Sequence, residues 1–330
     1  MHLAIHRQQL KSAMLPIAML GGAVFYKWMG HLSFLSPYLI FAMLFVTYCK
    51  LNPHELRPKR SHILLLSAQA ALGAVVYLLI APFNHTVAEG LFVCVFMPTA
   101  TAAPVITAML GGSISFVATY SLICNLAVAV IGPFVLAAIG DNESLSFMTS
   151  TLLILSKVAP LLICPLILAI IFRKTMPKAH KAVAGNQQLS FYMWAVSLFI
   201  IVGNCVSFVI NHWDEKELPS IILMIVGSFA TCVVQYVIGR RIGKSLNDIT
   251  VADVSGAEKI PDFRVSTAQS LMQKNTVLGV WIAMTYMTPI ASVAPAAYIA
   301  WHNLVNSWQL WKHENNKTAG EKHAGAACKK

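Results

Sequence analysis

Ten stretches of about 20 mostly apolar residues recur along this chain, and they limit what it can fold into more than any other feature. A stretch of about 20 apolar residues crosses the hydrocarbon core of a bilayer as an α-helix. With 57% hydrophobic and 11% charged residues, the composition lies outside the range of ordinary soluble domains. The sequence therefore predicts an all-α membrane protein with ten spans, at roughly 10–28, 32–49, 62–82, 89–110, 114–139, 149–172, 189–211, 219–239, 266–287 and 291–311.

The basic residues are distributed along the chain in a way that predicts its orientation. Most of the 24 Lys and Arg fall in the five segments that ten spans place on one side, whereas acidic residues, Glu89 among them, predominate on the other. Cytoplasmic loops carry the excess of Lys and Arg in membrane proteins. We therefore expect a multi-pass protein of the bacterial inner (plasma) membrane with both termini in the cytoplasm. The net charge of +11 then reflects topology and contact with anionic membrane lipid, and no nucleic-acid partner is expected.

The order of the spans predicts an internal repeat. Residues 1–172 hold spans one to six, residues 173–311 hold spans seven to ten, and the polar segment 312–330 is expected to be a disordered cytoplasmic tail. Ten spans divide into two groups of five, and an odd number of spans makes the two groups enter the membrane from opposite sides. The fourth span of each group carries a polar interruption, at Met97–Ser113 and Ser266–Gly279. Two inverted five-helix repeats are therefore predicted.

Two prolines interrupt span four. Pro98 and Pro104 remove backbone donors and clash with the preceding helical turn, which leaves carbonyl groups without partners near the middle of the membrane. Such backbone is tolerated where it is buried in protein or lines a wet cavity, and Thr99, Thr101 and Thr107 place hydroxyls beside it. One interpretation is a binding site. The other is a kinked helix whose small residues allow close packing.

Span nine carries the most polar segment within a predicted span. Gln269, Gln273, Lys274, Asn275 and Thr276 lie in its first half, and an ammonium at the bilayer centre costs about 2.5–3.5 kcal/mol. If the span began near Asn275, Lys274 would lie in cytoplasmic water. The apolar segment left before Pro289 would then be too short to cross at about 1.5 Å per residue. We therefore favour an intramembrane Lys274 as a functional residue.

Several classes of function lack the residues that they need. Asp and Glu fall in loops, in the tail or at span edges, so a carboxylate-based proton relay or metal centre within the membrane is not expected. The sequence has no nucleotide-binding loop and no hydrolase motif, and its cysteines are scattered singly. The chain is therefore not expected to be an enzyme or to hold a cofactor. The buried amides Gln69, Asn125, Asn204 and Asn303 are most simply hydrogen-bonding links between helices.

Three segments together resemble the bile acid:sodium symporter superfamily. They are "PTATAAPVITAMLGGSIS" in span four, "KVAPLLICPLILAIIFRK" in span six and "TAQSLMQKNTVLGVWIAM" in span nine. The resemblance implies ten spans in two inverted five-helix repeats, with broken helices 4 and 9 that cross. It also implies a panel of spans one, two, six and seven and a core of spans three to five and eight to ten.

The resemblance also implies an ion site, from which this chain departs. Where sodium-coupled members have a Ser-Asn pair, this chain has Ala103 and Pro104, and Gln269 stands in place of their glutamate. Gln273 is retained, Lys274 lies at or next to their asparagine, and Val117 replaces a hydroxyl. Gln69 and Ser121 match positions that contribute ligands. Sodium prefers hard oxygen donors, and these substitutions remove several of them. The sodium ligands therefore look degraded, and a proton is the alternative coupling ion.

The predicted function is secondary active transport of an organic anion, bile acid-like or a small carboxylate, by alternating access. The alternative is a membrane receptor or sensor that has the same fold and does not transport. The polar residues of separate spans are expected to gather around one cavity, where the Lys274 ammonium takes the place of sodium. The candidate substrate or ion-binding residues are Gln69, Thr101, Pro104, Thr107, Ser121, Asn125, Gln269, Gln273, Lys274, Asn275 and Thr276.

Overall fold

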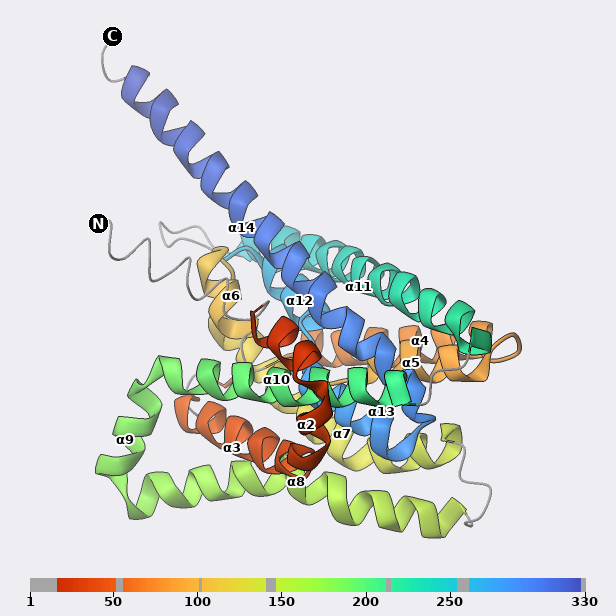
Figure 1. Cartoon of the computed structure of the whole chain (residues 1–330). Helices are drawn as coiled ribbons and strands as arrows, with labels where there is room; N and C mark the ends of the chain where they lie inside the picture. Colours follow the sequence, from red (N-terminus) through yellow and green to blue (C-terminus); the bar gives the residue numbers. More distant parts are fainter. Residues whose placement is uncertain are drawn as a thin grey trace.

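The protein folds as a bundle of long helices. The computed structural model describes residues 17–51, 56–100, 103–140, 147–211, 215–253 and 261–327. A helix over residues 17–24 comes first. It is followed by α2 (Tyr26–Leu32), α3 (Leu35–Lys50), α4 (Arg60–Ile80), α5 (His85–Phe96), α6 (Ala103–Met109), α7 (Ile114–Ile139), α8 (Phe147–Thr175), α9 (Pro177–Gly185), α10 (Gln187–Asn211), the short η2 (Glu215–Glu217), α11 (Leu218–Asp253), α12 (Phe263–Met272), α13 (Thr276–Tyr286), η3 (Pro289–Ser292) and α14 (Val293–Ala327) (Figure 1).

Several of these helices have the length and the composition of membrane spans. Within the described residues, α4, α7, α8 and the Leu218–Leu246 part of α11 are long and apolar enough to cross a bilayer. The pair α2 and α3, bent by 71° at its break, passes the same test as one unit. Large apolar side chains such as Leu78, Ile170 and Val226 are exposed on the outer faces, where they suit contact with lipid tails. The chain is thus an all-α, multi-pass membrane protein.

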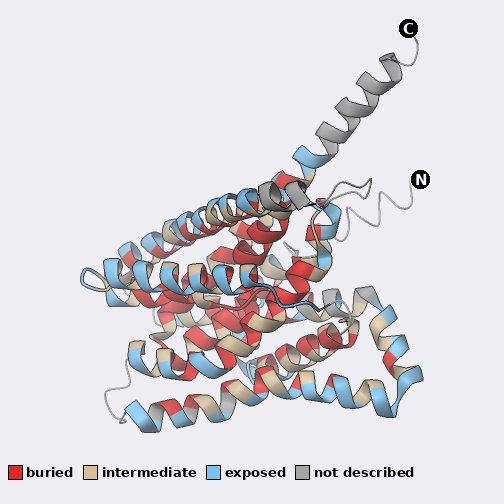
Figure 2. Cartoon of the chain, turned by 180° about the vertical axis from the view of Figure 1, so that it is seen from behind, coloured by how far each residue is buried: buried red, intermediate tan, exposed pale blue. Residues whose placement is uncertain are grey.

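The helices pack in two groups. In the first, α3 packs on α8, α9 and α10, and α2 packs on α10. In the second, α11 packs on α5, α12 and α14, and α4 packs on α5. Figure 1 shows the first group at the bottom of the molecule and most of the second above it. Contacts of α13 with α3 and α10 join the groups, and Figure 2 shows buried residues concentrated on the inner helices.

Several helix bounds agree with the apolar pattern, and others extend beyond it. The helix α7 covers the predicted stretch 114–139, because the apolar run is uninterrupted and Ser113 caps its start by accepting a hydrogen bond from the Phe116 N–H. In contrast, α11 continues to Asp253 and α14 to Ala327. Residues 312–327, which their composition predicts to be disordered, are therefore helical in the structure. The Ala, Glu and Lys of this segment are good helix formers.

Close helix contacts depend on glycine at particular positions. A Cβ added to Gly239 of α11 would lie 2.5 Å from the Ala268 Cα and 2.7 Å from the Thr267 carbonyl oxygen, both on the backbone of α12. The Thr267 hydroxyl also donates a hydrogen bond of 2.6 Å to the Gly239 carbonyl. The absence of a side chain at Gly239 therefore lets α12 lie directly against α11, which positions the break that follows α12.

Candidate functional site

Both predicted interruptions are real breaks, and the two unwound segments lie against each other. The first separates α5 from α6, and the second separates α12 from α13. Thr99 and Lys274 form an antiparallel bridge between the breaks. The Ala100 N–H donates to the Gln273 carbonyl at 2.8 Å, and the Asn275 N–H donates to the Pro98 carbonyl at 2.8 Å. We call the segments Met97–Ala100 and Gln273–Asn275 together the crossing.

The local sequence explains where the helices stop and restart. Met97 precedes a proline, a position that disfavours helical backbone, and it has an extended ψ of 142°. Pro104 lies in the first turn of α6, where a missing N–H costs no helical bond. At the second break, the Asn275 side chain caps α13 by accepting a hydrogen bond of 3.2 Å from the Leu278 N–H. Prolines make the first break and a polar cap makes the second.

A glutamine and a tyrosine satisfy the carbonyls at the first break. The Gln69 amide from α4 donates to the Phe96 carbonyl at 3.1 Å and to the Met97 carbonyl at 3.2 Å. The Tyr120 hydroxyl from α7 donates to the Gln69 Oε1 at 2.8 Å and so orients the amide. The helix before the broken pair, α4, and the helix after it, α7, thus both hold the end of α5 in place.

The second break also has a glutamine and a tyrosine beside it, but with their roles exchanged, because here the tyrosine and not the glutamine holds the carbonyl. Gln235 of α11 donates to the Tyr298 hydroxyl of α14 at 3.0 Å, and that hydroxyl donates to the Met272 carbonyl at 2.8 Å. Again the glutamine precedes the broken pair and the tyrosine follows it. Tyr120 and Tyr298 each lie in the second turn of their helices, α7 and α14. The equivalent placement of the two Gln–Tyr pairs agrees with an internal repeat. Sequence analysis did not single out Tyr120, Gln235 or Tyr298. Counted from the paired residues Thr99 and Lys274, the two tyrosines lie 21 and 24 positions further on, so an ungapped alignment of the two halves does not pair them.

Lys274 is buried at the centre of the crossing. Its side chain is 1% exposed, so the alternative in which Lys274 lies in cytoplasmic water is wrong for this structure. Its Nζ has no hydrogen-bond partner among the described residues. The Gln273 Nε2 and the Thr276 Oγ1 are also buried without partners there. The crossing therefore gathers three hydrogen-bond donors, one of them the Lys274 amine, whose burial as an unpaired charge is costly.

Residues of α7 complete one side of the crossing. The Ser121 hydroxyl donates to the Thr99 carbonyl at 3.3 Å, and the Asn125 amide donates to the Ser121 carbonyl at 2.7 Å. The Asn125 Oδ1 is buried and has no partner among the described residues. Ser121 and Asn125 thus lie on the same side of the crossing as the carbonyl of Thr99.

Other predicted residues lie elsewhere. Gln269 turns away from the crossing, because its amide donates to the Asn306 Oδ1 at 3.2 Å and to the Gln309 Oε1 at 3.5 Å, both on α14. The predicted common site includes Gln269, but the hydrogen bonds of Gln269 connect it to α14 and not to the crossing. The Thr107 hydroxyl bonds within α6, to the Ala103 carbonyl at 2.8 Å, and Pro104 is half-buried. Thr101 lies outside the described residues.

The sequence predicts Glu89 to lie at the outer edge of span four, and the structure places it inside a helix instead. It lies within α5, which begins at His85, and it is fully buried. Its Oε2 accepts a hydrogen bond of 3.1 Å from the Thr288 N–H, and its Oε1 lies 3.9 Å from the His85 Nδ1. The carboxylate therefore ties α5 to the turn before η3. The apolar run begins after Glu89, but the Asn84 cap, which accepts from the Val87 N–H, starts the helix one turn earlier.

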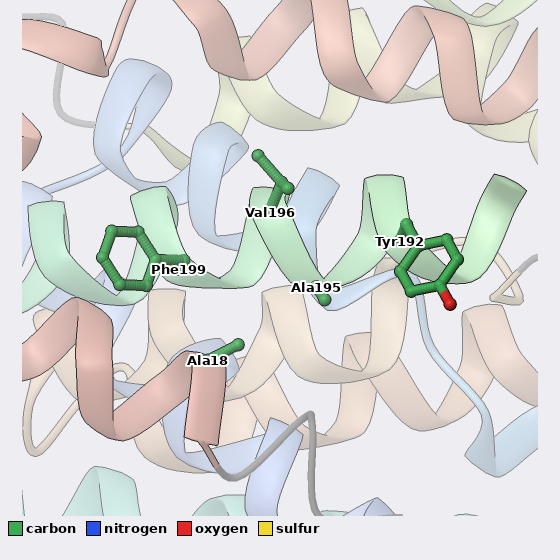
Figure 3. Close-up of a pocket in the computed structure, with 5 residues that line it drawn as sticks. All are labelled: Ala18, Tyr192, Ala195, Val196 and Phe199. Atoms are coloured by element: carbon green, nitrogen blue, oxygen red, sulfur yellow. The ribbon is translucent and has the colours of Figure 1, made fainter. Parts of the chain in front are cut away.

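Figure 3 shows a hollow that is separate from the crossing. It has a volume of about 290 Å³ and lies between the helix over residues 17–24 and α10. Ala18, Tyr192, Ala195, Val196 and Phe199 line it, and they give it an apolar wall. A mostly apolar groove of this kind on an outer helix suits a lipid tail.

Comparison of the chain with models of protein families and with curated proteins gave no match. The crossing and the three sequence segments are therefore the features of the chain that bear on its function.

Proposed function

We propose that the protein is a secondary transporter that moves an organic anion across the membrane by alternating access. One observation carries the proposal: the Lys274 ammonium is buried at the crossing of two broken helices and has no hydrogen-bond partner among the described residues. An intramembrane ionisable residue in a protein interior is characteristic of a substrate or ion pathway. An anionic ligand would supply the missing counter-charge.

The chemistry of the crossing favours a carboxylate or a sulfonate. The Lys274 Nζ, the Gln273 Nε2 and the Thr276 Oγ1 offer donors to its oxygens. In addition, α13 begins at Thr276, so the positive end of its dipole faces the same place. The substrate class is therefore an organic anion, bile acid-like or a small carboxylate. Because the crossing residues are buried, the helices around them must move apart before such an anion can enter.

The proposed architecture has ten spans in two inverted five-helix repeats. The paired breaks support it. So do the Gln69–Tyr120 and Gln235–Tyr298 hydrogen bonds, each of which joins the two helices that flank a broken pair. In this arrangement the group formed by α2, α3, α8 and α10 is the panel, and the group that holds the crossing is the core. Movement of one group against the other would open the crossing to each side in turn. The charge pattern supports an inner-membrane location with both termini in the cytoplasm.

The coupling ion follows from the side chains present. Gln269 offers no carboxylate, and Ala103 and Pro104 offer no side-chain oxygen, so a sodium cage is poorly supplied. A fixed ammonium at Lys274 also repels sodium from the crossing. We therefore propose transport that does not require sodium, with a proton as the coupling ion.

Uptake into proteoliposomes tests the proposal. Labelled taurocholate and a set of labelled short carboxylates would be offered to the purified protein and to Lys274→Gln, with Lys178→Gln, which changes an exposed lysine of α9, as the matched control. We expect uptake of at least one anion by the unmodified protein and by the control, and its loss in Lys274→Gln. Binding of an anion without flux would favour the receptor alternative, and uptake unchanged in Lys274→Gln would contradict the role of the ammonium.

A further inference from the structure

A line of polar side chains runs along one face of α14. Tyr298, His302, Asn306, Gln309 and His313 follow one another at intervals of three or four residues, so they share a face of the helix. The first four are buried and His313 is exposed. We call these five residues the α14 stripe. It begins at the crossing, where Tyr298 bonds the Met272 carbonyl, and it ends at the surface.

The exposed end of the stripe meets other surface elements. The His313 ring lies beside Gly111, at 3.9 Å from the position of a Cβ added there. The Gly111 carbonyl accepts a hydrogen bond of 3.2 Å from the Asp262 N–H, which precedes α12. This end therefore lies where the start of α12 and the turn after α6 come together, which is the cytoplasmic side in the proposed orientation.

The middle of the stripe holds hydrogen-bonding atoms that the protein does not satisfy. Both ring nitrogens of His302 are buried without a partner among the described residues, as are the Asn306 Nδ2, the Gln309 Nε2 and the Gln269 Oε1. Burial of a polar group without a partner costs about 1–3 kcal/mol. Exchange of the oxygen and nitrogen of an amide can change which amide atoms are paired. It leaves both nitrogens of His302 without partners.

The kinds of atoms present identify the ligand. A neutral imidazole offers one donor and one acceptor, and the neighbouring amides offer both kinds of group without net charge. The described residues contain no group of three His, Cys, Asp or Glu side chains that could hold a metal ion. Water donates and accepts equally well, and buried water commonly joins about three polar groups that otherwise lack partners.

We propose that the α14 stripe binds a file of water molecules that joins the surface at His313 to the crossing, and that His302 passes protons along this file. In each passage one ring nitrogen of His302 accepts an excess proton from the water on one side and the other nitrogen releases its proton to the water on the other side, after which the ring turns over to restore its first tautomer. One N–H bond forms and one breaks, so no net charge stays on the ring. The proton role rests on the proposed coupling to protons, whereas the water file does not.

The groups around His302 are compatible with this role. On α14 itself, Tyr298 lies with its ring centre 5.7 Å from that of His302. Cys94 of α5 and Cys232 of α11 interact electrostatically with Tyr298, and Cys94 also interacts with Lys274. From α12, the uncharged Gln269 faces the stripe. The Gln235 Nε2 links this end of the stripe to α5, because it donates to the Tyr298 hydroxyl at 3.0 Å and to the Cys94 carbonyl at 3.5 Å.

Hydroxyl-radical labelling in ¹⁸O-water tests the water file without any substrate. Radicals formed from bound water mark the side chains beside it, so we expect ¹⁸O on His302 in the unmodified protein. Met224 is equally buried but lies in the apolar core, and it serves as the dry reference although methionine is intrinsically reactive. Labelling of His302 well above that of Met224 supports the file. Labelling no greater than that of Met224 overturns it, whatever the result of the transport assay.

Proton flux into liposomes that contain a pH-sensitive dye tests the role of His302. With a potassium diffusion potential as the driving force, we expect flux through the unmodified protein and flux about tenfold slower in His302→Phe, which keeps the ring size. The matched control is Asn303→Leu, whose amide bonds only the Ile299 carbonyl of its own helix. Equal flux in His302→Phe and the unmodified protein, or no flux above that of empty liposomes, overturns the proton role. Unchanged anion exchange in His302→Phe would show that the variant is folded.

Discussion

Thr99 and Lys274 pair through their backbones although they lie 175 positions apart in the sequence, with the seven α-helices from α6 to α12 between the two breaks. The Thr99 side chain also reaches the second broken helix pair, because its hydroxyl donates to the Ser270 carbonyl at 2.7 Å. Each unwound segment therefore supplies one backbone donor and one backbone acceptor to the other, and side chains of neighbouring helices satisfy the carbonyls where α5 and α12 end.

Sodium should not stimulate transport. Anion uptake into proteoliposomes is expected to be the same when choline replaces sodium, because the Lys274 ammonium occupies the crossing and Gln269 bonds α14 instead of offering a carboxylate. The measurement is the initial rate of uptake in each buffer at a fixed pH gradient. Strong stimulation by sodium would show that the side chains of the crossing hold the ion after all.

Loss of the Gln69 amide should destabilise the first break. Gln69→Leu leaves the Phe96 and Met97 carbonyls without their side-chain donor, at a cost of about 1–3 kcal/mol for each unsatisfied group. Tyr120→Phe removes one hydrogen bond and should cost about 1 kcal/mol. The two effects should not add, because both variants disturb one network. Thermal unfolding in detergent measures them, with the exposed Tyr38→Phe as control; additive losses would argue against a shared network.

Two glycine substitutions should have opposite effects. Gly239→Ala places a Cβ 2.5 Å from backbone of α12, which no side-chain rotation relieves, and should destabilise the protein by about 1–3 kcal/mol. Gly30→Ala meets no atom within 4 Å and lies inside α2, so it should stabilise the helix by up to about 1 kcal/mol. Melting temperatures of the two variants test this. A neutral Gly239→Ala would mean that α11 and α12 are not so closely packed.

Acid should weaken the contact between α8 and α9. The pKa of His180 in α9 is lowered, mainly by burial and next by the charge of Arg173, with a backbone hydrogen bond at Cys49 in partial opposition. The Arg173 Nε donates to the His180 Nε2 at 3.3 Å, a bond that protonation of the ring removes. Because the folded-state pKa lies below the unfolded value of about 6.5, stability is present above that pH and is lost as the pH falls. Melting temperatures between pH 8 and 5 should fall less steeply in His180→Leu. An identical slope in the variant would assign the pH dependence to other groups.

Much of the helical framework follows from the sequence alone. A long apolar run such as 114–139 folds as one helix because it carries no charged residue and satisfies most of its backbone groups within itself, even across Pro133. The breaks follow in the same local way, from Pro98 in the first and from the polar segment ending in the Asn275 cap in the second. The same local pattern predicts that Lys274 lies near the middle of a span.

Partners across the bundle depend on tertiary structure. The spacing of residues does not predict that Gln269 bonds Asn306 on α14 instead of facing Gln273. The partner of Gln269 depends on how α12 is rotated toward its neighbours. The burial of Lys274 has the same origin, since a long side chain can extend to water or fold into protein according to what packs around it. The pairing of Thr99 with Lys274 requires two distant breaks to meet at the same depth. Sequence determines where each helix must end, and only the packing of the whole bundle decides which freed groups satisfy one another.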